Sequence, residues 1–436
     1  WYWMPDVFES FFRHFGKRPS DYYKLERLNP SYRIFYGKDD HLDVPADLQD
    51  LYTMAEKLEP GSRENLEKFL EAGKYKYDIG VRKLVYKPGL SLTELLDADV
   101  IKNLFRLDVF GSISSHIKKY FKNPRLVQML EFPVLFLGAR PEETPALYSL
   151  MNYADMALGT WYPHGGMYSV IDGMFSLAKS LGVKFEFDSA VQQLHVNSVS
   201  VQGCTVNDEF RPFDYVVASA DYFHVEQNLL PPTHRKYSKP YWEKRTLAPS
   251  ALIFFLGLNK KIKNLCHHSL FFDQDFKKHA DELYLNPQWP SAPQFYASCP
   301  SKTDATVAPP GCENLFILIP VAAGLEDNES TREKYFEIVL KRLELILGEN
   351  IRDHIVFKRG YAHNDFVQDY NAFKGNAYGL ANTLLQTANF KPSIASKKLN
   401  NLFYAGQLTV PGPGVPPALI SGEVAAKELI RRHKKS

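Results

Sequence analysis

The chain has 436 residues, of which 45% are apolar and 14% aromatic. So much apolar side-chain mass can bury a core, which excludes a disordered protein, and the length corresponds to roughly three domains or one large multi-part enzyme. The 52 Lys and Arg nearly balance the 50 Asp and Glu, so the net charge gives no global attraction to nucleic acid. No apolar run approaches the roughly 18 residues that span a bilayer.

The first half of the chain predicts mainly helices. Apolar residues recur at helical spacing over residues 6–16, which predicts an amphipathic helix that ends at Gly16. Long charged and apolar stretches between 45 and 160 are typical of helices as well. Beyond Gly165 and Gly166, one apolar face predicts a further helix over 168–181.

The second half predicts strands and two more helices. Alternation of apolar and polar residues predicts short strands at 183–187, 191–196, 199–206 and 215–218. Strand-forming runs fill residues 250–325, and a charged amphipathic helix is predicted over 329–347. A buried strand over 399–407 then leads into glycines and a final helix, as expected of a nucleotide-binding α/β domain with an inserted region.

The stretch 402–426 (LFYAGQLTVPGPGVPPALISGEVAA) is the strongest candidate for a ligand site. Glycines let the backbone approach a flat ligand, and the start of a helix directs a positive dipole end toward it. Pro416 and Pro417 suit the first turn of that helix. The same residues fit, equally well, a proline-rich loop before a tightly packed helix.

Two further stretches carry candidate residues. The sequence Trp161-Tyr162-Pro163-His164-Gly165-Gly166 predicts a loop that a ligand can approach closely, although an ordinary turn into a helix fits as well. Asp304 lies between strand-like segments with few other charges, so it is either a single acid–base group or the cap of a turn. Asp221, at the end of a predicted strand, has the same two interpretations.

Several sequence motifs are missing. The chain contains no GxGxxG after a strand, no GxxxxGK[ST], no GxSxG and no HExxH, so kinase, hydrolase and metalloprotease functions have no support. No CxxC pair occurs, and we expect reduced thiols and no bound metal. The pair His267-His268 is interpreted as a surface or strand-end feature.

Residues 101–125 combine six basic side chains, one acid and interleaved apolar residues. This pattern fits an amphipathic segment at a membrane interface, rimmed by Lys118, Lys119 and Phe121. A helical hairpin with its basic face in water fits about as well.

These motifs together resemble the bacterial-type phytoene desaturases, FAD-dependent carotenoid desaturases within the amine-oxidase-like group of flavoproteins. The resemblance runs from Trp1 to Leu429 and rests on the segments 161–166, 213–221, 300–309 and 402–426. Members of that family begin with a GxGxxG turn that binds the FAD pyrophosphate. This chain opens with Trp1 and has no such turn, so the resemblance leads us to expect a missing upstream segment.

The resemblance implies an α/β fold in which a Rossmann-like FAD-binding domain, without its first βαβ segment, is interleaved with a mixed-sheet substrate domain and a helical membrane-facing region. The expected limits are 1–35, 161–225 and 396–436 for the FAD-binding domain, 36–160 for the helical region and 226–395 for the substrate domain.

The implied reaction introduces double bonds into phytoene or a similar long polyene precursor, on the way to lycopene. Hydride passes to FAD, a proton leaves the neighbouring carbon, and Asp304 is the candidate proton acceptor or cation stabiliser. The resemblance also implies a set of cofactor contacts: Gly165, Gly166, Val191, Asp221, Gly406, Gln407, Pro411, Gly412, Gly414, Val415 and Pro416.

The expected partners are the apolar polyene, a membrane surface, and a quinone or oxygen that reoxidises the flavin. Because such a substrate dissolves in lipid, we expect a peripheral protein on the cytoplasmic face of a bacterial membrane. The alternatives are a related carotenoid flavoprotein, such as an isomerase or ketolase, and a truncated, non-catalytic prenyl-binding homologue.

Overall fold

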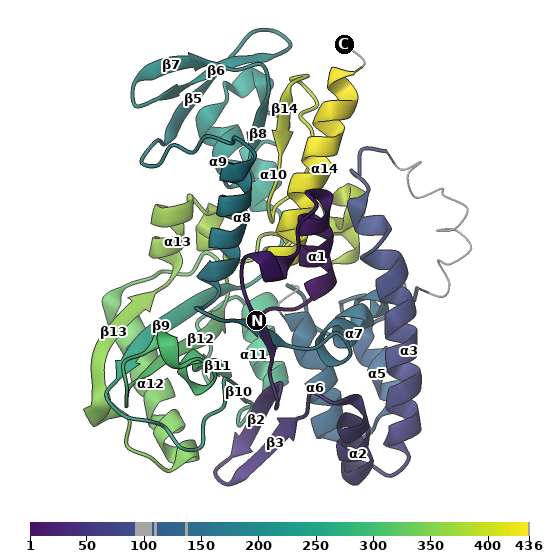
Figure 1. The fold of residues 1–436 in the computed structure, drawn as a ribbon, viewed down its shortest axis with the longest axis vertical. Helices are drawn as coiled ribbons and strands as arrows, with labels where there is room; N and C mark the ends of the chain where they lie inside the picture. The colour runs from purple at the N-terminus through teal and green to yellow at the C-terminus, as the bar shows by residue number, and fades with distance from the viewer. Residues whose placement is uncertain (92–106, 109–110, 136–137, 435–436) are drawn as a thin grey trace.

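A seven-stranded mixed sheet forms the centre of the computed structural model, which describes residues 1–91, 107–108, 111–135 and 138–434 (Figure 1). The strand order is β13-β9-β12-β11-β10-β2-β3, and only β2 and β10 pair in parallel. The strands are β2 (Tyr32–Gly37), β3 (Asp40–Val44), β9 (Ser250–Leu258), β10 (His268–Phe271), β11 (Phe295–Ser298), β12 (Glu313–Val321) and β13 (Ile355–Tyr361).

One face of this sheet packs against the long helix α12 (Glu329–Leu347). Successive side chains of a strand point to opposite faces, so Leu315, Ile317 and Ile319 of β12 all face the same way. They meet Val339 and Leu340 of α12 in a fully buried cluster. The helix occupies the residues predicted for it, 329–347.

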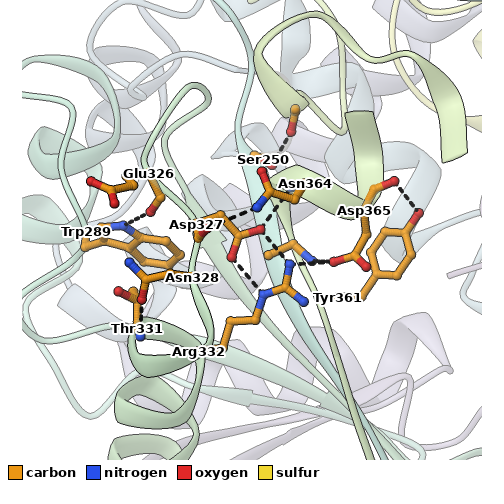
Figure 2. Close-up of polar contacts among 12 residues, drawn as sticks. Ser250, Trp289, Glu326, Asp327, Asn328, Thr331, Arg332, Tyr361, Asn364 and Asp365 are labelled. Atoms are coloured by element: carbon orange, nitrogen blue, oxygen red, sulfur yellow. Dashed lines mark hydrogen bonds and ion pairs between the residues drawn. The ribbon is translucent and has the colours of Figure 1, made fainter. Parts of the chain in front are cut away.

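A salt-bridge network fixes the start of α12 to α13 (His363–Tyr370). Arg332 donates from Nε and Nη2 to the two carboxylate oxygens of Asp327 at 2.7 and 2.6 Å. Its Nη2 also donates to Asp365 at 2.6 Å, and the Asn364 N–H donates to Asp327 at 2.9 Å (Figure 2). This network connects the helix that covers the sheet to the helix that follows β13.

The opposite face of the sheet is covered by helices from residues 48–135. Alternate residues of the strands, among them Ala251, Leu270 and Leu318, join a core cluster with these helices. The helices are α2 (Leu48–Leu58), α3 (Ser62–Gly80), α5 (Ile113–Tyr120) and α6 (Pro124–Leu135). The predicted helical character of this part of the chain is therefore confirmed.

A second region brings together segments that are far apart in the sequence (Figure 1). Strands β8 (Val216–Ala218) and β14 (Leu402–Tyr404) pair in parallel, beside an antiparallel sheet of β5 (Val191–Val196), β6 (Val201–Val206) and β7 (Glu209–Pro212). Helices α1 (Pro5–His14), α8 (Tyr168–Ser180) and α14 (Val415–His433) lie here too. Phe8 and Phe12 of α1 share a core cluster with Val170 of α8, and Leu419 of α14 packs against that cluster.

The remaining strands and α-helices of the described chain are short. They are β1 (Leu25–Arg27), α7 (Leu150–Met156), β4 (Trp161–Pro163), α9 (Tyr222–His224), α10 (Lys239–Glu243) and α11 (Phe276–Tyr284).

One expectation about an element differs from the structure. Residues 183–187 form no strand, because alternation of side chains cannot supply the neighbouring strand that a β-ladder requires. Residue 35, the expected end of the first FAD-domain segment, lies in β2, which pairs with β10, and the domain limits stay a prediction. Within the described residues, no helix is both long and apolar enough to cross a membrane.

Candidate functional site

Residues 405–414 form the loop between β14 and α14, called the glycine loop below. Three of its residues are glycines in conformations that other residues rarely adopt. Gly406 has φ +107°, Gly412 +136° and Gly414 +105°. The Gly406 N–H donates to the Ser421 hydroxyl of α14 at 2.8 Å, which fixes the start of the loop to the helix. Without Cβ atoms, the backbone of this loop offers a surface that a flat ring can approach closely.

Helix α14 begins at Val415, directly after this loop. Pro416 and Pro417 have no N–H, and the Ala418 N–H donates to the Gly414 carbonyl at 2.9 Å. The Val415 N–H is therefore the remaining hydrogen-bond donor of the first turn. The helix therefore brings its positive dipole end to the loop but few hydrogen-bond donors.

Asp221 and Gln407 both lie beside this loop. The carbonyl oxygen of Ser219 is 3.7 Å from the position that a Cβ on Gly406 would take, so β8 ends next to β14. The Asp221 carboxylate accepts from the His224 N–H at 3.2 Å and the Phe373 N–H at 3.1 Å. Burial raises the pKa of Asp221 to about 6. These bonds make it a cap of α9 and an anchor for residue 373, and its contact with a cofactor stays a prediction.

Gln407 connects the glycine loop to residues 375–379. Its Nε2 donates to Asn376 Oδ1 at 3.3 Å, and Asn376 Oδ1 also accepts from the Gly379 N–H at 2.8 Å. A Cβ on Gly379 would come within 2.9 Å of the Gln407 carbonyl oxygen. Gly379 is therefore required for this close approach of two backbones.

The predicted loop at Gly165 and Gly166 lies between β4 and α8. Both residues have positive φ, +85° and +96°. A Cβ on Gly166 would meet no heavy atom of the described chain within 4 Å, and one on Gly165 would meet only Ser169 at 3.9 Å. The loop therefore faces open space, as a close-approach loop should.

Asp304, which is distant in sequence, accepts hydrogen bonds from this loop and from β4. Its Oδ2 accepts from the Gly165 N–H at 2.7 Å and the Tyr162 hydroxyl at 3.2 Å. Its Oδ1 accepts from the Thr306 N–H at 2.9 Å and the Thr306 hydroxyl at 2.6 Å. The residue is only 2% exposed. Burial alone raises the pKa of Asp304, but these hydrogen bonds outweigh it and hold the pKa well below its usual range.

A carboxylate in this state is a strong acceptor of hydrogen bonds and a weak proton acceptor. The geometry therefore shows Asp304 anchoring the Gly165 loop to the turn at residues 304–306. Its role in proton transfer stays a prediction from the sequence.

Two histidines at the start of β10 lie beside this anchor. His267 is hydrogen-bonded through Nδ1 to the Thr303 hydroxyl at 2.7 Å, and its ring centroid is 4.6 Å from that of Tyr162. Burial lowers the pKa of His267 to about 3, so the ring is neutral. His268 stacks on Trp1 at 4.4 Å and is hydrogen-bonded to the Tyr296 hydroxyl at 2.6 Å. The interpretation as a strand-end feature is confirmed, and the surface interpretation is wrong because both side chains are buried.

Asp155 is a second buried carboxylic acid, which the sequence analysis missed. It accepts from the Tyr32 hydroxyl at 2.8 Å and the Thr160 hydroxyl at 3.1 Å. Burial raises its pKa to about 7, the range of an effective general base. The available signal was a single acid in the otherwise uncharged stretch from Tyr148 to Tyr162.

An apolar cavity lies on the face of the sheet away from α12. The space in it that the centre of a water-sized sphere can occupy is about 40 Å³. Its lining comes from β10, β11 and β12, from α6 and α11, and from residues 249–250 and 378. The lining residues are Phe132, Pro249, Ser250, Leu270, Phe272, Phe276, His279, Ala280, Leu283, Gln294, Phe295, Tyr296, Leu318, Pro320 and Tyr378.

The cavity and the glycine loop share one connecting segment. Tyr378 lines the cavity, and the next residue, Gly379, packs on Gln407. The Ser250 hydroxyl, also in the lining, donates to the Gly375 carbonyl. Residues 375–379 therefore separate an apolar compartment from the backbone surface after β14.

The other predicted site residues lie farther out. Val191 is on β5 and is 38% exposed, and its contact with adenine stays a prediction.

The residues of the predicted membrane surface lie on or next to α5. Lys118 and Lys119 are exposed there, and Lys118 donates to the Ser114 hydroxyl at 2.8 Å. Phe121 is 1% exposed and packs against Phe69, so the expectation that it reaches the surface is wrong. Its ring completes the core that α5 forms with α3. Part of the basic and apolar stretch 101–125 lies outside the described residues, including Leu104, Phe105, Val109 and Phe110.

The sequence matches proteins of known classes over almost its whole length. A carotenoid 3,4-desaturase of Haloarcula japonica is 41% identical over 431 residues, which cover 99% of this chain and 87% of that protein. A 4,4'-diapophytoene desaturase of Staphylococcus aureus strain Newman is 30% identical over 446 residues, with 98% and 88% covered.

Solved structures agree on the fold. Cyclohexylamine oxidase from Brevibacterium oxydans superposes with a TM-score of 0.53 at 11% identity, over 98% of this chain and 86% of that one. An oxidoreductase from Methanosarcina mazei gives 0.58 at 13% identity, over 93% and 82%. The family model described as flavin containing amine oxidoreductase matches residues 17–430. With its fold, its glycine loops and its desaturase relatives in agreement, the chain belongs to the flavin-containing amine oxidoreductase family.

Proposed function

We propose that this protein is an FAD-dependent desaturase that introduces carbon–carbon double bonds into a carotenoid precursor. The observation that carries the proposal is an apolar cavity whose lining residues Ser250 and Tyr378 contact or belong to the segment 375–379, which also packs on Gln407 of the glycine loop after β14. A hydrocarbon substrate offers no polar group, so a wall of aliphatic and aromatic side chains is what can bind and orient it. The carotenoid desaturases among its relatives support the same substrate class.

The residues present fit the cofactor. Gly165, Gly166, Gly406, Gly412 and Gly414 all have positive φ and present bare backbone, and the positive end of α14 lies beside the last of them. FAD, when bound, supplies the acceptor for the hydride that leaves the substrate. We propose that these glycines, with the Val415 N–H, lie against the cofactor.

The chain's own residues are proposed to exclude water from the site and to accept the proton that leaves the substrate. The cavity lining excludes water and holds the reacting bond in place, and its aromatic rings, such as Phe132 and Tyr296, stabilise positive charge that develops on the polyene. Asp304 positions the Gly165 loop, and we propose it, as the sequence does, as the group that accepts the proton or stabilises the cation.

The experiment is product analysis with purified protein. The protein is loaded with FAD and incubated with phytoene in vesicles, and the products are separated and their absorption spectra and masses recorded. Each added double bond moves the absorption to longer wavelength and lowers the mass by two hydrogens. An isomer of unchanged mass, an oxygenated product, or no product with flavin bound would each contradict desaturation.

We also propose that β8, β14 and α14 are the closing unit of a Rossmann-like FAD-binding domain with the limits 161–225 and 396–436. The parallel register of β14 on β8, Leu402 with Val216 and Tyr404 with Ala218, supports this proposal. So does the start of α14 eleven residues after that strand ends. Limited proteolysis with and without FAD tests the limits, because cofactor should protect both segments together.

Peripheral membrane binding is a further part of the proposal. The exposed Lys118 and Lys119 on α5 support contact with an anionic lipid surface on the cytoplasmic side. Co-sedimentation with vesicles that contain anionic lipid should fall when both lysines are replaced by glutamate. Equal binding of the Lys118→Glu/Lys119→Glu variant would remove this surface from the proposal. Turnover with a quinone or with oxygen alone identifies the electron acceptor.

A further inference from the structure

Two buried polar atoms near the glycine loop have no hydrogen-bond partner within the described chain. They are Nζ of Lys391 and Oδ1 of Asn382, and each residue is 4% exposed. Both are close to Gly412. The position that a Cβ on Gly412 would take lies 3.1 Å from Lys391 Nζ and 3.4 Å from Asn382 Oδ1.

This arrangement is costly for the protein alone. A buried ammonium group without a partner loses its hydration and gains nothing in return, and burial lowers the pKa of Lys391 to about 7. Buried polar groups in native proteins are nearly always hydrogen-bonded. A donor and an acceptor that are both unpaired beside one glycine therefore point to a ligand.

We expect that ligand to be flat and polar, because it must fit against the bare backbone of the glycine loop and pair with two polar atoms. Gly412 has φ +136° and no side chain, so nothing of its own lies between the loop and the two polar atoms. Helix α14 contributes little hydrogen bonding here, because Pro416 and Pro417 have no N–H. A ligand at this loop needs its polar partners from elsewhere in the chain.

We infer that Lys391 and Asn382 bind the imide edge of the flavin pyrimidine ring, with Nζ donating to a ring carbonyl and Oδ1 accepting from the ring N–H. An imide edge presents an acceptor beside a donor, which is the complement of the donor and acceptor that the protein leaves unpaired. The inference rests on the proposed function, since it assigns residues to the cofactor of that reaction.

The chemical consequence follows from charge. A flavin that has gained a hydride carries negative charge on its pyrimidine ring, and an ammonium group beside that ring stabilises it. Lys391 thus makes the bound flavin a better hydride acceptor. Asn382 fixes the orientation of the ring without adding charge.

Sulfite tests this charge without any substrate. Its sulfur lone pair forms a bond to N5 of the oxidised flavin, and the electron pair displaced from the C=N bond becomes negative charge on the pyrimidine ring. The adduct bleaches the flavin absorption band, so a titration of the FAD-loaded protein gives a dissociation constant for sulfite.

The expected result is selective for Lys391. A charge-assisted hydrogen bond contributes about 1.5–3 kcal/mol, so Lys391→Met should weaken sulfite binding about tenfold to hundredfold. Lys391→Arg keeps the charge and should stay close to the wild type. Lys397→Met, at an exposed position six residues along, is the matched control and should change nothing.

A second measurement separates this role from a structural one. Removing an unpaired buried cation should raise the Tm of the protein without FAD, while the increase in Tm that FAD produces should become smaller. Bound flavin with the same sulfite affinity in wild type and Lys391→Met would overturn the inference alone. A wild-type protein that binds flavin, loses sulfite affinity on Lys391→Met and yet forms no desaturated product would overturn the proposed function alone.

Discussion

At the scale of single residues, the site depends on two buried acids with opposite pKa shifts. Asp304 accepts four hydrogen bonds and is held ionised, whereas Asp155 accepts two from neutral hydroxyls and its pKa is raised to about 7. Burial is common to both, so the number and kind of donors decides which way each pKa moves. Each state has its own experimental consequence.

Asp155 should make stability depend on pH. Between about pH 4 and 7 the folded protein holds this proton and the unfolded chain does not, so stability falls as pH rises through that window. The Asp155→Asn variant has no such proton and should lose this part of the slope, a difference of roughly 2–4 kcal/mol. Urea unfolding of both proteins at pH 5 and pH 8 measures it. Parallel slopes in the two proteins would contradict the raised pKa.

Replacing Asp304 should weaken the binding of FAD. In Asp304→Ala the N–H groups of Gly165 and Thr306 lose their acceptor, which costs about 1–3 kcal/mol. We expect weaker FAD binding and, because we propose Asp304 as a group of the reaction, lower turnover once the protein is saturated with FAD. Unchanged FAD binding would contradict its part in holding the loop, and unchanged turnover would contradict its part in the reaction.

At the scale of elements, α14 keeps the glycine loop in place through one hydroxyl. Ser421 is fully buried, accepts from the Gly406 N–H and donates to the Ala418 carbonyl at 2.6 Å. Ser421→Ala leaves the Gly406 N–H without this partner, so we expect a loss of about 1–2 kcal/mol and faster FAD release. Ser180→Ala, at the exposed end of α8, is the control and should be nearly neutral in denaturant unfolding.

The salt-bridge network between α12 and α13 provides the second element-scale prediction. Arg332→Met leaves Asp327 buried without its cation, which should cost about 3–5 kcal/mol in urea unfolding. The pair of Arg352, in the turn after α12, and Glu337, on α12, is half exposed, so Arg352→Met should cost less than about 1 kcal/mol. Equal losses in the two variants would show that the network contributes no more than a surface pair.

The sequence predicted some elements well for physical reasons. The first helix has strong apolar periodicity, and it and the helix 329–347 are followed by the stop signals Gly16 and Gly348; the structure confirms both, and the final helix as well. The positive φ values of the Gly165 and Gly406 loops follow from their residue types. The sequence could not predict the hydrogen bond from Gly165 to Asp304 or the approach of Lys391 to Gly412. Both contacts join residues far apart in the chain, and a local sequence pattern carries no information about such contacts.

At the scale of the molecule, the proposal places the apolar substrate in the cavity beside α11. Ala280 on α11 is a small residue in its lining, so Ala280→Trp should fill the space and abolish turnover of a long polyene. FAD binding should persist, because the glycine loop lies beyond residues 375–379. Lys277→Trp, on the exposed side of the same helix, is the control. Normal turnover by Ala280→Trp would place the substrate elsewhere.

The parallel pairing of β2 with β10 has a consequence for how the chain folds. Arg33 lies opposite Ser269 in that pairing, so the hairpin of β2 and β3 leaves the ribosome long before its neighbouring strand exists. Contacts between such distant residues form slowly, and an unpaired strand edge invites association with other chains meanwhile. We expect the hairpin to gain hydrogen-exchange protection late in refolding, after the antiparallel strands β9 and β12. Cells that produce this protein should therefore yield more soluble material when synthesis is slow.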